Sequence, residues 1–275
     1  MPNARLAVLV STTLVACHGG ATNPHGGHRA APAPAAPAMT EAAIAMVIAP
    51  GKTAAWQAAL AELTGPRYAE YDASRRRFGL TAQTTFLQQT PMGDLALIHL
   101  TGPDVRAAFH RMSASQDPWD VRWRELTRDL HGVDFATGAA AQPVVEAAYQ
   151  MDVGATPGSQ EFLFAAPLTA AGVDDLRRLS TELMGPRHAA YVEARRQLGV
   201  EREAVFLETT PQGAVAVFYW RAPDPRASLR RLAASSSPFD AWLRTQAAAL
   251  HPVGLDLLTQ IASGNTLVGQ YPQAR

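Results

Sequence analysis

The sequence lacks the features that mark several protein classes. It has one cysteine in 275 residues, which excludes an internal disulfide framework. Lysine plus arginine number 24, as do aspartate plus glutamate, so the net charge of zero indicates no nucleic-acid partner. The sequence contains no glycine-rich phosphate loop, Cys/His metal cluster or Ser-His-Asp signature. We therefore expect no bound metal and no cofactor.

The N-terminus has an apolar run that is too short to span a bilayer. Residues 6–16 follow the positive Arg5, which is typical of an export signal. The run ends in Leu14-Val15-Ala16-Cys17, which resembles the lipobox of bacterial lipoproteins. The resemblance implies a signal peptide over 1–16, acylation of Cys17 and a membrane as partner. The alternative is an ordinary secretory signal with an incidental thiol.

The residue after the cysteine bears on location. His18 stands there, not aspartate, which by analogy with bacterial lipoproteins implies the outer membrane if the cell has two membranes. Residues 17–40 predict a tether, because prolines alternate with alanines in a pattern that favours extended, polyproline-like chain. Its histidines could bind a metal loosely, or belong to a polar linker, since their spacing matches no closed metal site.

The rest of the chain is a tandem repeat. Residues 63–133 and 183–253 align without a gap at an offset of 120, with 28 identities in 71 positions. Such a repeat predicts two homologous modules related by pseudo-symmetry. We place the first module at 41–149, a linker at 150–160 and the second module at 161–275.

Each module has the element order β-α-β-β-α-β, which is ferredoxin-like. Apolar runs and alternation predict the strands, and apolar spacings of three and four predict the helices. In the second helical region, Asp117-Pro118 and Ser237-Pro238 indicate a helix start after a break. The predicted strands are 44–49, 85–89, 94–100 and 144–149 in the first module, and 161–165, 205–209, 214–220 and 266–271 in the second.

Both faces of the third strand of each module are apolar. Leu97 and His99 point to one side of the strand, and Ile98 and Leu100 point to the other. Helices cover only one face of such a sheet, so the other face requires a second apolar layer. We therefore expect an α+β fold in which two ferredoxin-like βαββαβ modules pack, sheet against sheet, as an intrachain pseudo-dimeric α/β barrel.

The repeated motifs support this arrangement. Gly65-Pro66-Arg67, Tyr71 and Arg75-Arg76 resemble a small uncharacterised bacterial family with a G-P-R-x-x-x-Y-x-x-x-R-R helix. The two modules together resemble a tandem fusion within the dimeric α/β-barrel superfamily. That superfamily includes monooxygenases, haem-degrading enzymes, isomerases and stress proteins, so the resemblance implies a fold without choosing a reaction. The second module departs from the family pattern at Pro252 and Gly254.

Arg67 and Arg187 are candidate ligand-binding residues. Each lies on the apolar stripe of the first predicted helix, which runs from Trp56 to Phe78 in the first module and from Leu176 to Leu198 in the second. Each is one turn before a tyrosine, Tyr71 or Tyr191. Each also follows a Gly-Pro pair, which interrupts a helix. One hypothesis is that these four residues form polar pockets for a carboxylate or carbonyl group. The other is that the kink turns the arginines outward, where they pair with local acids.

A second set of candidates lies on the strands. His99 and Tyr219 occupy matching positions on the third strands, and Glu208 lies on the second strand of its module. If they face the other sheet, they line a barrel cavity in which Glu208 and Tyr219 could transfer protons. The alternative is an ordinary core. His131 and His251 end the second helical region, where they could act as acid, base or metal ligand, or favour the helix terminus as cations.

These observations lead to two functional hypotheses. The first is a lipid-anchored, non-catalytic envelope protein that binds a small apolar or acidic ligand, or a protein partner. The second is a cofactor-light monooxygenase or isomerase of the dimeric α/β-barrel type. A cavity with converging Arg, Tyr or His side chains between the sheets would favour the enzyme.

Overall fold

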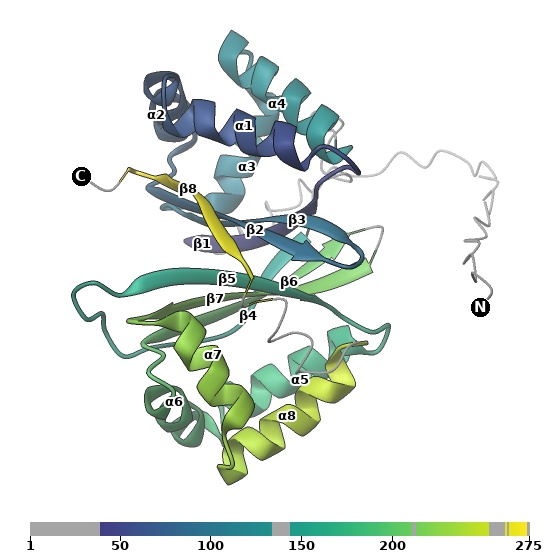
Figure 1. Ribbon diagram of the computed structural model, residues 1–275, viewed down its shortest axis with the longest axis vertical. Helices are drawn as coiled ribbons and strands as arrows, with labels where there is room; N and C mark the ends of the chain where they lie inside the picture. Colours follow the sequence, from purple (N-terminus) through teal and green to yellow (C-terminus); the bar gives the residue numbers. More distant parts are fainter. Residues whose placement is uncertain (1–38, 134–143, 211–212, 253–261, 263, 274–275) are drawn as a thin grey trace, which may run out of the picture. The chain divides into compact units, whose positions relative to one another are not determined.

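Two antiparallel sheets of four strands and eight helices form the part of the chain that is described by the computed structural model (Figure 1). The described residues are 39–133, 144–210, 213–252, 262 and 264–273. The predicted signal peptide, Cys17 and nearly all of the predicted tether lie outside these residues. None of the helices in the described ranges is long and apolar enough to cross a membrane.

The two modules have the same element order along the chain. Each begins with a strand, continues through two helices, a β-hairpin and two more helices, and ends with a strand. In the first module these elements are β1 (Glu41–Val47), α1 (Thr53–Thr64), α2 (Tyr68–Phe78), β2 (Ala82–Thr90), β3 (Gly93–Thr101), α3 (Val105–Ala114), α4 (Pro118–His131) and β4 (Val144–Asp152). In the second they are β5 (Gln160–Pro167), α5 (Gly172–Met184), α6 (His188–Gln197), β6 (Arg202–Thr210), β7 (Gly213–Ala222), α7 (Pro225–Ala234), α8 (Pro238–Leu250) and β8 (Thr266–Tyr271).

The last strand of each module belongs to the sheet of the other module. The first sheet has the order β1-β3-β2-β8, and the second has the order β4-β6-β7-β5. Thus β4 pairs with β6, and β8 pairs with β2, both antiparallel. We expected each module to complete its own sheet. Because an apolar strand can pair with the exposed edge of either sheet, its sequence does not specify which one.

The linker is correspondingly shorter than expected. It was predicted at 150–160, but β4 continues to Asp152 and β5 begins at Gln160. The exchange of β4 and β8 means that each sheet contains strands from both repeats. Neither repeat alone therefore supplies a complete sheet.

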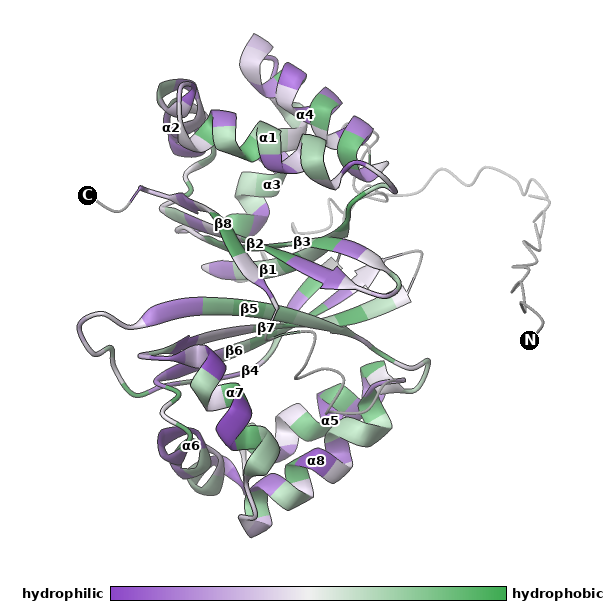
Figure 2. Cartoon of the chain, viewed as in Figure 1, coloured by the Kyte–Doolittle hydropathy of each residue, from purple (hydrophilic) through white to green (hydrophobic). Residues whose placement is uncertain are grey.

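The sheets pack face to face, and their helices cover the outer faces (Figure 1). One buried cluster contains residues of both repeats, including Leu97 of β3 and Val217 of β7. The rings of Phe86 and Phe162 meet edge to face across the join, with centroids 5.6 Å apart. Figure 2 shows hydrophobic residues along the central part of β5, where it lies against the first sheet. The predicted α+β fold with an intrachain pseudo-dimeric barrel is confirmed.

The Gly-Pro pairs separate two helices instead of bending one. Helix α1 ends at Thr64 and α2 begins at Tyr68, and the second module repeats this break between α5 and α6. A side chain at Gly65 would place its Cβ 2.7 Å from the carbonyl oxygen of Ala61, which is too close for any other residue. Since Pro66 also has no N–H to continue the helix, the break is fixed locally.

The predicted helix starts after the break in the second helical region are confirmed. The carboxylate of Asp117 accepts a hydrogen bond of 3.0 Å from the backbone N–H of Trp119. In the second module the hydroxyl of Ser237 accepts a hydrogen bond of 3.1 Å from the N–H of Asp240. Both bonds satisfy first-turn donors that have no partner within the helix.

Two matching side chains join the sheets at the outer edges of β1 and β5. Gln88 of β2 donates to the carbonyl of Ala165 at 2.8 Å and accepts from its N–H at 2.9 Å. At the equivalent place, Glu208 accepts from the N–H of Ala45 at 2.6 Å. An amide satisfies both backbone groups of an edge strand, whereas an ionised carboxylate can only accept. Burial of Glu208 raises the pKa of its carboxyl group to about 7.

We expect the protein to lose stability between about pH 5 and pH 8 because of Glu208. The folded pKa is raised above the ordinary value of 4.5, so the folded state holds a proton that the unfolded state releases in this window. The free energy of unfolding should therefore fall with rising pH, by on the order of 3 kcal/mol. Urea unfolding at a series of pH values measures it.

The matched control is Glu208→Gln, which copies the amide that Gln88 supplies in the other half. This variant should lose most of the pH dependence and be more stable than the original chain at pH 8, by about 1–3 kcal/mol. Identical pH profiles for the two proteins would show that Glu208 does not titrate in this window.

Candidate functional site

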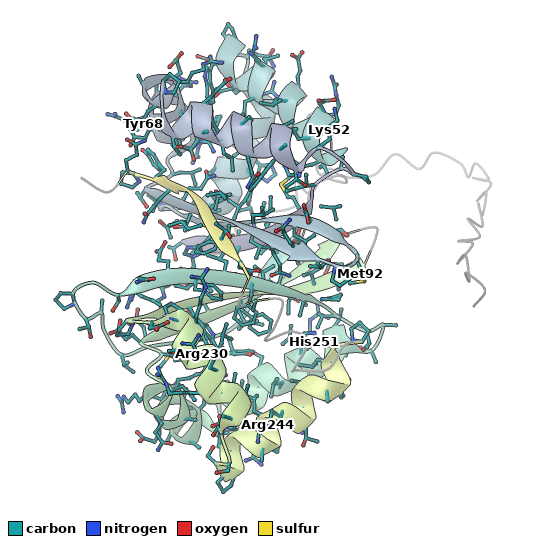
Figure 3. All side chains as sticks on the ribbon, viewed as in Figure 1. Lys52, Tyr68, Met92, Arg230, Arg244 and His251 are labelled. Atoms are coloured by element: carbon teal, nitrogen blue, oxygen red, sulfur yellow. The ribbon has the colours of Figure 1, made fainter. Side chains whose placement is uncertain are left out.

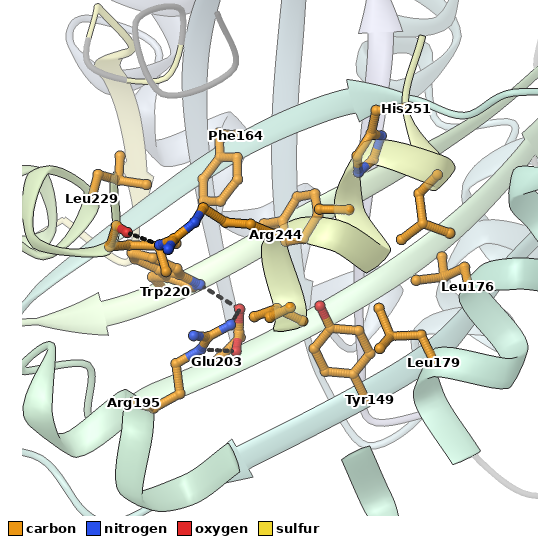
Figure 4. A pocket seen from close by; sticks show the side chains of 15 residues that line it. Tyr149, Phe164, Leu176, Leu179, Arg195, Glu203, Trp220, Leu229, Arg244 and His251 are labelled. Atoms are coloured by element: carbon orange, nitrogen blue, oxygen red, sulfur yellow. Dashed lines mark hydrogen bonds and ion pairs between the residues drawn. The ribbon is translucent and has the colours of Figure 1, made fainter. Parts of the chain in front are cut away.

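A pocket lies between the second sheet and the helices that cover it. Its cavity has a volume of about 70 Å³, and it is lined by residues of the second module together with Tyr149 of β4 (Figure 4). Most of its surface is apolar. The apolar lining includes Phe164, Leu176, Leu179, Phe218, Trp220 and Leu243.

The first sheet has a pocket of about 60 Å³ at the corresponding place. Most of the lining residues correspond at the repeat offset of 120, as Ile44 does to Phe164 and Trp56 to Leu176. Both pockets lie on the helix side of a sheet and not in the join between the sheets. Two cavities at matching places indicate that their position belongs to the repeated fold and not to one copy.

A buried ion pair forms the polar wall of the second pocket. The Nε of Arg195 donates to Glu203 at 2.6 Å, and both side chains are nearly inaccessible to solvent. The Tyr191 hydroxyl and the Trp220 indole N–H each donate to the same carboxylate at 2.8 Å. Burial works against the charge of Arg195, but Glu203 outweighs it and raises the pKa of that guanidinium. The cluster is therefore held as a charged pair.

The first pocket has a different polar wall. Arg75 matches Arg195, but Gln83 stands at the place of Glu203. The Nη1 of Arg75 donates to the amide oxygen of Gln83 at 3.0 Å, and Nη2 donates to the Ser74 hydroxyl at 3.3 Å. Ser74 in turn donates to Asp120 at 2.6 Å. The two pockets thus share a buried arginine but differ in what neutralises it.

Tyr149 and His251 add polar groups to the second pocket. Figure 4 shows the Tyr149 hydroxyl directed toward the interior, and burial raises the pKa of that hydroxyl. The Nδ1 of His251 lies 2.8 Å from the carbonyl oxygen of Pro167, and burial lowers the pKa of the imidazole. Since a carbonyl only accepts, Nδ1 carries the proton and Nε2 is the acceptor nitrogen. The lowered pKa favours the neutral imidazole, whose Nε2 can accept a proton.

The matching histidine of the first pocket is held in the same way. The Nδ1 of His131 lies 2.9 Å from the carbonyl oxygen of Val47, and burial lowers the pKa of its imidazole. The lowered pKa values argue against the hypothesis that His131 and His251 act as cations at helix ends. Arg244 and His251, labelled in Figure 3, approach the second pocket from α8 and the residue after it.

Arg67 and Arg187 lie at the helix breaks, on the surface. Arg67 pairs with Glu70 at 3.4 Å, and its side chain is 34% exposed. Arg187 pairs with Glu182 at 3.4 Å and stacks over the ring of Trp242. Neither arginine lines the two pockets described above. This placement favours the second of our two hypotheses, in which the break turns them toward local acids.

Tyr71 and Tyr191 are buried, but their neighbours are other arginines. The guanidinium of Arg75 lies 4.9 Å from the centre of the Tyr71 ring, and that of Arg195 lies 5.4 Å from the Tyr191 ring. The helical stripe therefore does carry an arginine-tyrosine pair into the core. The arginine is the one four residues after the tyrosine, not the one four residues before it.

His99 and Tyr219 face the join between the sheets and stack on each other, with ring centroids 4.2 Å apart. The Tyr219 hydroxyl donates to Glu161 at 2.9 Å, and burial raises the pKa of that hydroxyl. Glu208 is opposite Val215, four residues from Tyr219 along β7, a separation of roughly 13 Å. The structure therefore does not bring Glu208 and Tyr219 together for proton transfer.

The buried arginines and their partners were not among the predicted site residues. Arg75 and Arg195 belong to the repeated R-R motif, and Gln83 and Glu203 follow eight residues later in both copies. That spacing crosses a helix end and a strand start, so only the fold shows that the side chains meet. Within the described part of the chain, no group of three or more His, Cys, Asp or Glu side chains could hold a metal ion.

Neither a protein-family model nor a curated protein sequence matches the chain. Solved structures similar in fold include a candidate monooxygenase from Fusobacterium nucleatum subsp. nucleatum, at 10% identity and a TM-score of 0.42, over 84% of this chain and 92% of that one. An anthrone oxidase-like protein has 12% identity and a TM-score of 0.43, with the same coverages of 84% and 92%. A candidate monooxygenase from Lactobacillus acidophilus has 12% identity and a TM-score of 0.39, over 78% and 90%. These similarities are too distant to indicate an activity.

We expect Glu203→Ala to be strongly destabilising. The substitution leaves the buried Arg195 guanidinium without its carboxylate and removes the acceptor for Tyr191 and Trp220. Removing one partner of a buried ion pair costs about 3–5 kcal/mol. Gln83→Ala, at the equivalent place in the first module, removes a neutral partner and should cost about 1–2 kcal/mol. Equal losses in urea unfolding would contradict this view of the cluster.

Proposed function

We propose that this chain is a lipid-anchored envelope protein that binds a compact, largely apolar small molecule in each of two pockets. The observation that carries the proposal is the pair of cavities at matching places between sheet and helices. A duplicated module that keeps its cavity in both copies has retained a feature that a well-packed core would not need. Such voids reduce stability unless something occupies them.

The chemistry of the lining supports a small-molecule site. Ligand pockets are mostly apolar, with a few polar groups that fix orientation. The second pocket has this composition, with aliphatic and aromatic walls around the Tyr149 hydroxyl, the Arg195–Glu203 pair and the acceptor nitrogen of His251. A ligand that has an aromatic or branched aliphatic body and one or two polar substituents fits this wall.

The join between the sheets supports the fold better than it supports a ligand site. Its central side chains make contacts with each other, as in the stacked pair His99 and Tyr219 and the ring pair Phe86 and Phe162. Its polar groups are used in hydrogen bonds between strands, such as those of Gln88. We therefore place the ligand sites on the helix sides of the sheets.

One observation favours a second candidate, an enzyme that works without a metal. His251 has a neutral imidazole with its protonated nitrogen held by Pro167, which is the arrangement of a general base in an apolar pocket. A monooxygenase or isomerase of the dimeric α/β-barrel type would use such a base to remove a proton from its substrate. If NMR spectra show that a ligand bound in the second pocket is chemically converted, the enzyme is favoured over a binding protein.

Binding can be tested with the neutral probe benzamide, using the tryptophan indole N–H signals in ¹H–¹⁵N NMR spectra. Trp220 lines the second pocket, and Trp56 and Trp123 line the first. We expect benzamide to shift all three signals in a saturable way. Ala247→Phe should fill the second pocket, removing the Trp220 response and weakening binding there by at least about tenfold, while the first pocket still responds.

The control is Ala248→Phe, at an exposed position next along the same helix. It should leave both responses unchanged. No saturable shift at any of the three tryptophans, with benzamide or with other compact aromatic probes, would contradict the proposed function.

The membrane anchor is a separate part of the proposal and rests on the lipobox-like sequence that ends at Cys17. Expressed in a bacterium from its full sequence, the chain should fractionate with membranes and incorporate labelled fatty acid. Cys17→Ser should remove the acyl label and release most of the protein to the aqueous fraction, because one lost thiol removes the only attachment point. Unchanged membrane fractionation of the variant would contradict the anchor.

A further inference from the structure

We propose that the pocket of the first module binds its ligand through a carboxylate group at Arg75, whereas the pocket of the second module takes neutral ligands. This inference rests on the proposed function, since it assigns a ligand class to each of the two pockets. It comes from a difference between two otherwise matching sites: the buried arginine has a carboxylate partner within the second pocket and none within the first.

The guanidinium of Arg75 is almost completely buried and incompletely partnered. The side chain lines the first pocket, and the residue is 3% exposed. Two of its nitrogens donate to neutral oxygens, on Gln83 and Ser74. Its Nε is buried and has no hydrogen-bond partner in the described part of the chain. Because arginine stays protonated in proteins, this charge needs an anion or further acceptors.

The nearest carboxylate does not satisfy that need. Asp120 reaches Arg75 only through the Ser74 hydroxyl, and it also pairs with Arg77 at 3.0 Å. Asp120 further accepts a hydrogen bond of 2.6 Å from Ser115. One buried carboxylate is thus shared between two arginines, and its oxygens are already bonded to other groups.

The second module supplies a negative charge inside the pocket, although the Nη1 of Arg195 is likewise buried without a hydrogen-bond partner among the described residues. Glu203 replaces Gln83 and contacts Arg195 directly at 2.6 Å. The relay through Ser74 is gone, because Ala194 stands at that position, and Asp240 has one buried oxygen, Oδ1, without a partner in the described residues. The counterion of the buried arginine therefore lies inside the pocket in the second module, as Glu203. In the first module it lies outside the pocket, as Asp120.

The wall of the first pocket is also more polar than that of the second. The first contains the hydroxyl groups of Thr85 and Thr127, and the matching residues in the second half are Val205 and Ala247. A second arginine, Arg124, also lines the first pocket and donates to a backbone carbonyl at 2.9 Å. Its counterpart Arg244 does the same at 3.2 Å, so this arginine does not distinguish the sites.

The surroundings of Arg75 indicate the chemical class of the ligand. An ionised carboxylate placed at Arg75 would accept from Nε and supply the negative charge that Gln83 lacks, in a charge-assisted hydrogen bond. The first pocket is also lined by Trp56, Phe109 and Trp123, beside aliphatic residues. A compact aromatic carboxylic acid combines these two properties. The second pocket would reject it, because Glu203 would face the ligand carboxylate as a like charge.

The test compares the binding of benzoate with that of its neutral isostere benzamide to the full chain. Binding is monitored through the tryptophan indole N–H signals. Benzoate should shift Trp56 and Trp123 but not Trp220, and should bind the first pocket at least about tenfold more tightly than benzamide does. Gln83→Glu, which copies the second module, should weaken benzoate by about tenfold or more and change benzamide by less than about threefold.

A reciprocal variant tests the same inference if Gln83→Glu folds poorly. The double substitution Ala194→Ser with Glu203→Gln copies the first module into the second, and benzoate should then shift Trp220 as well. Thermal unfolding of each variant shows whether it is folded, and Gln83→Glu should be at least as stable as the original chain.

The outcomes separate this inference from the proposal beneath it. Benzamide bound in both pockets, with no preference for benzoate in the first or no effect of Gln83→Glu, would overturn the carboxylate assignment alone. No binding of either probe in either pocket would overturn the proposed function as well.

Discussion

The structure depends on the burial of two apolar sheet faces against each other. Each sheet is covered by helices on one side only, so its other face would remain in water without the second sheet. Burial of apolar surface, at roughly 25 cal/mol per Å², therefore stabilises the join. The exchanged strands β4 and β8 reinforce it, because they add backbone pairing to side-chain packing.

The join is filled by packing, and the two cavities lie on the helix sides of the sheets. The cavities lie there because aromatic and aliphatic side chains from strand and helix do not close fully around a buried polar cluster. The same fold therefore separates two tasks. One face of each sheet holds the halves together, and the other face borders a small pocket lined by apolar side chains and a buried arginine.

Duplication within one chain lets the two copies diverge. In an identical dimer, a change at one position appears at both sites, whereas here Gln83 and Glu203 differ while Arg75 and Arg195 are the same. The sheet edges show a similar divergence, with Gln88 against Ala165 and Glu208 against Ala45. In both pairs an amide in the first half matches a carboxylate in the second. The matching position in the other module therefore shows the same environment with and without each carboxylate.

The sequence by itself determined the repeat, the order of elements and the meeting of the sheets, because periodicity and apolar content are local properties that one-dimensional spacing records. The tertiary structure alone decided which sheet received β4 and β8, since the edge strands of both sheets could accept them. It also decided that Arg67 goes to the surface while Arg75 goes to the core, because the helix break at Gly65 and Pro66 resets the helical phase. The pairing of Arg195 with Glu203 depends on a turn between helix and strand, whose geometry no residue spacing specifies.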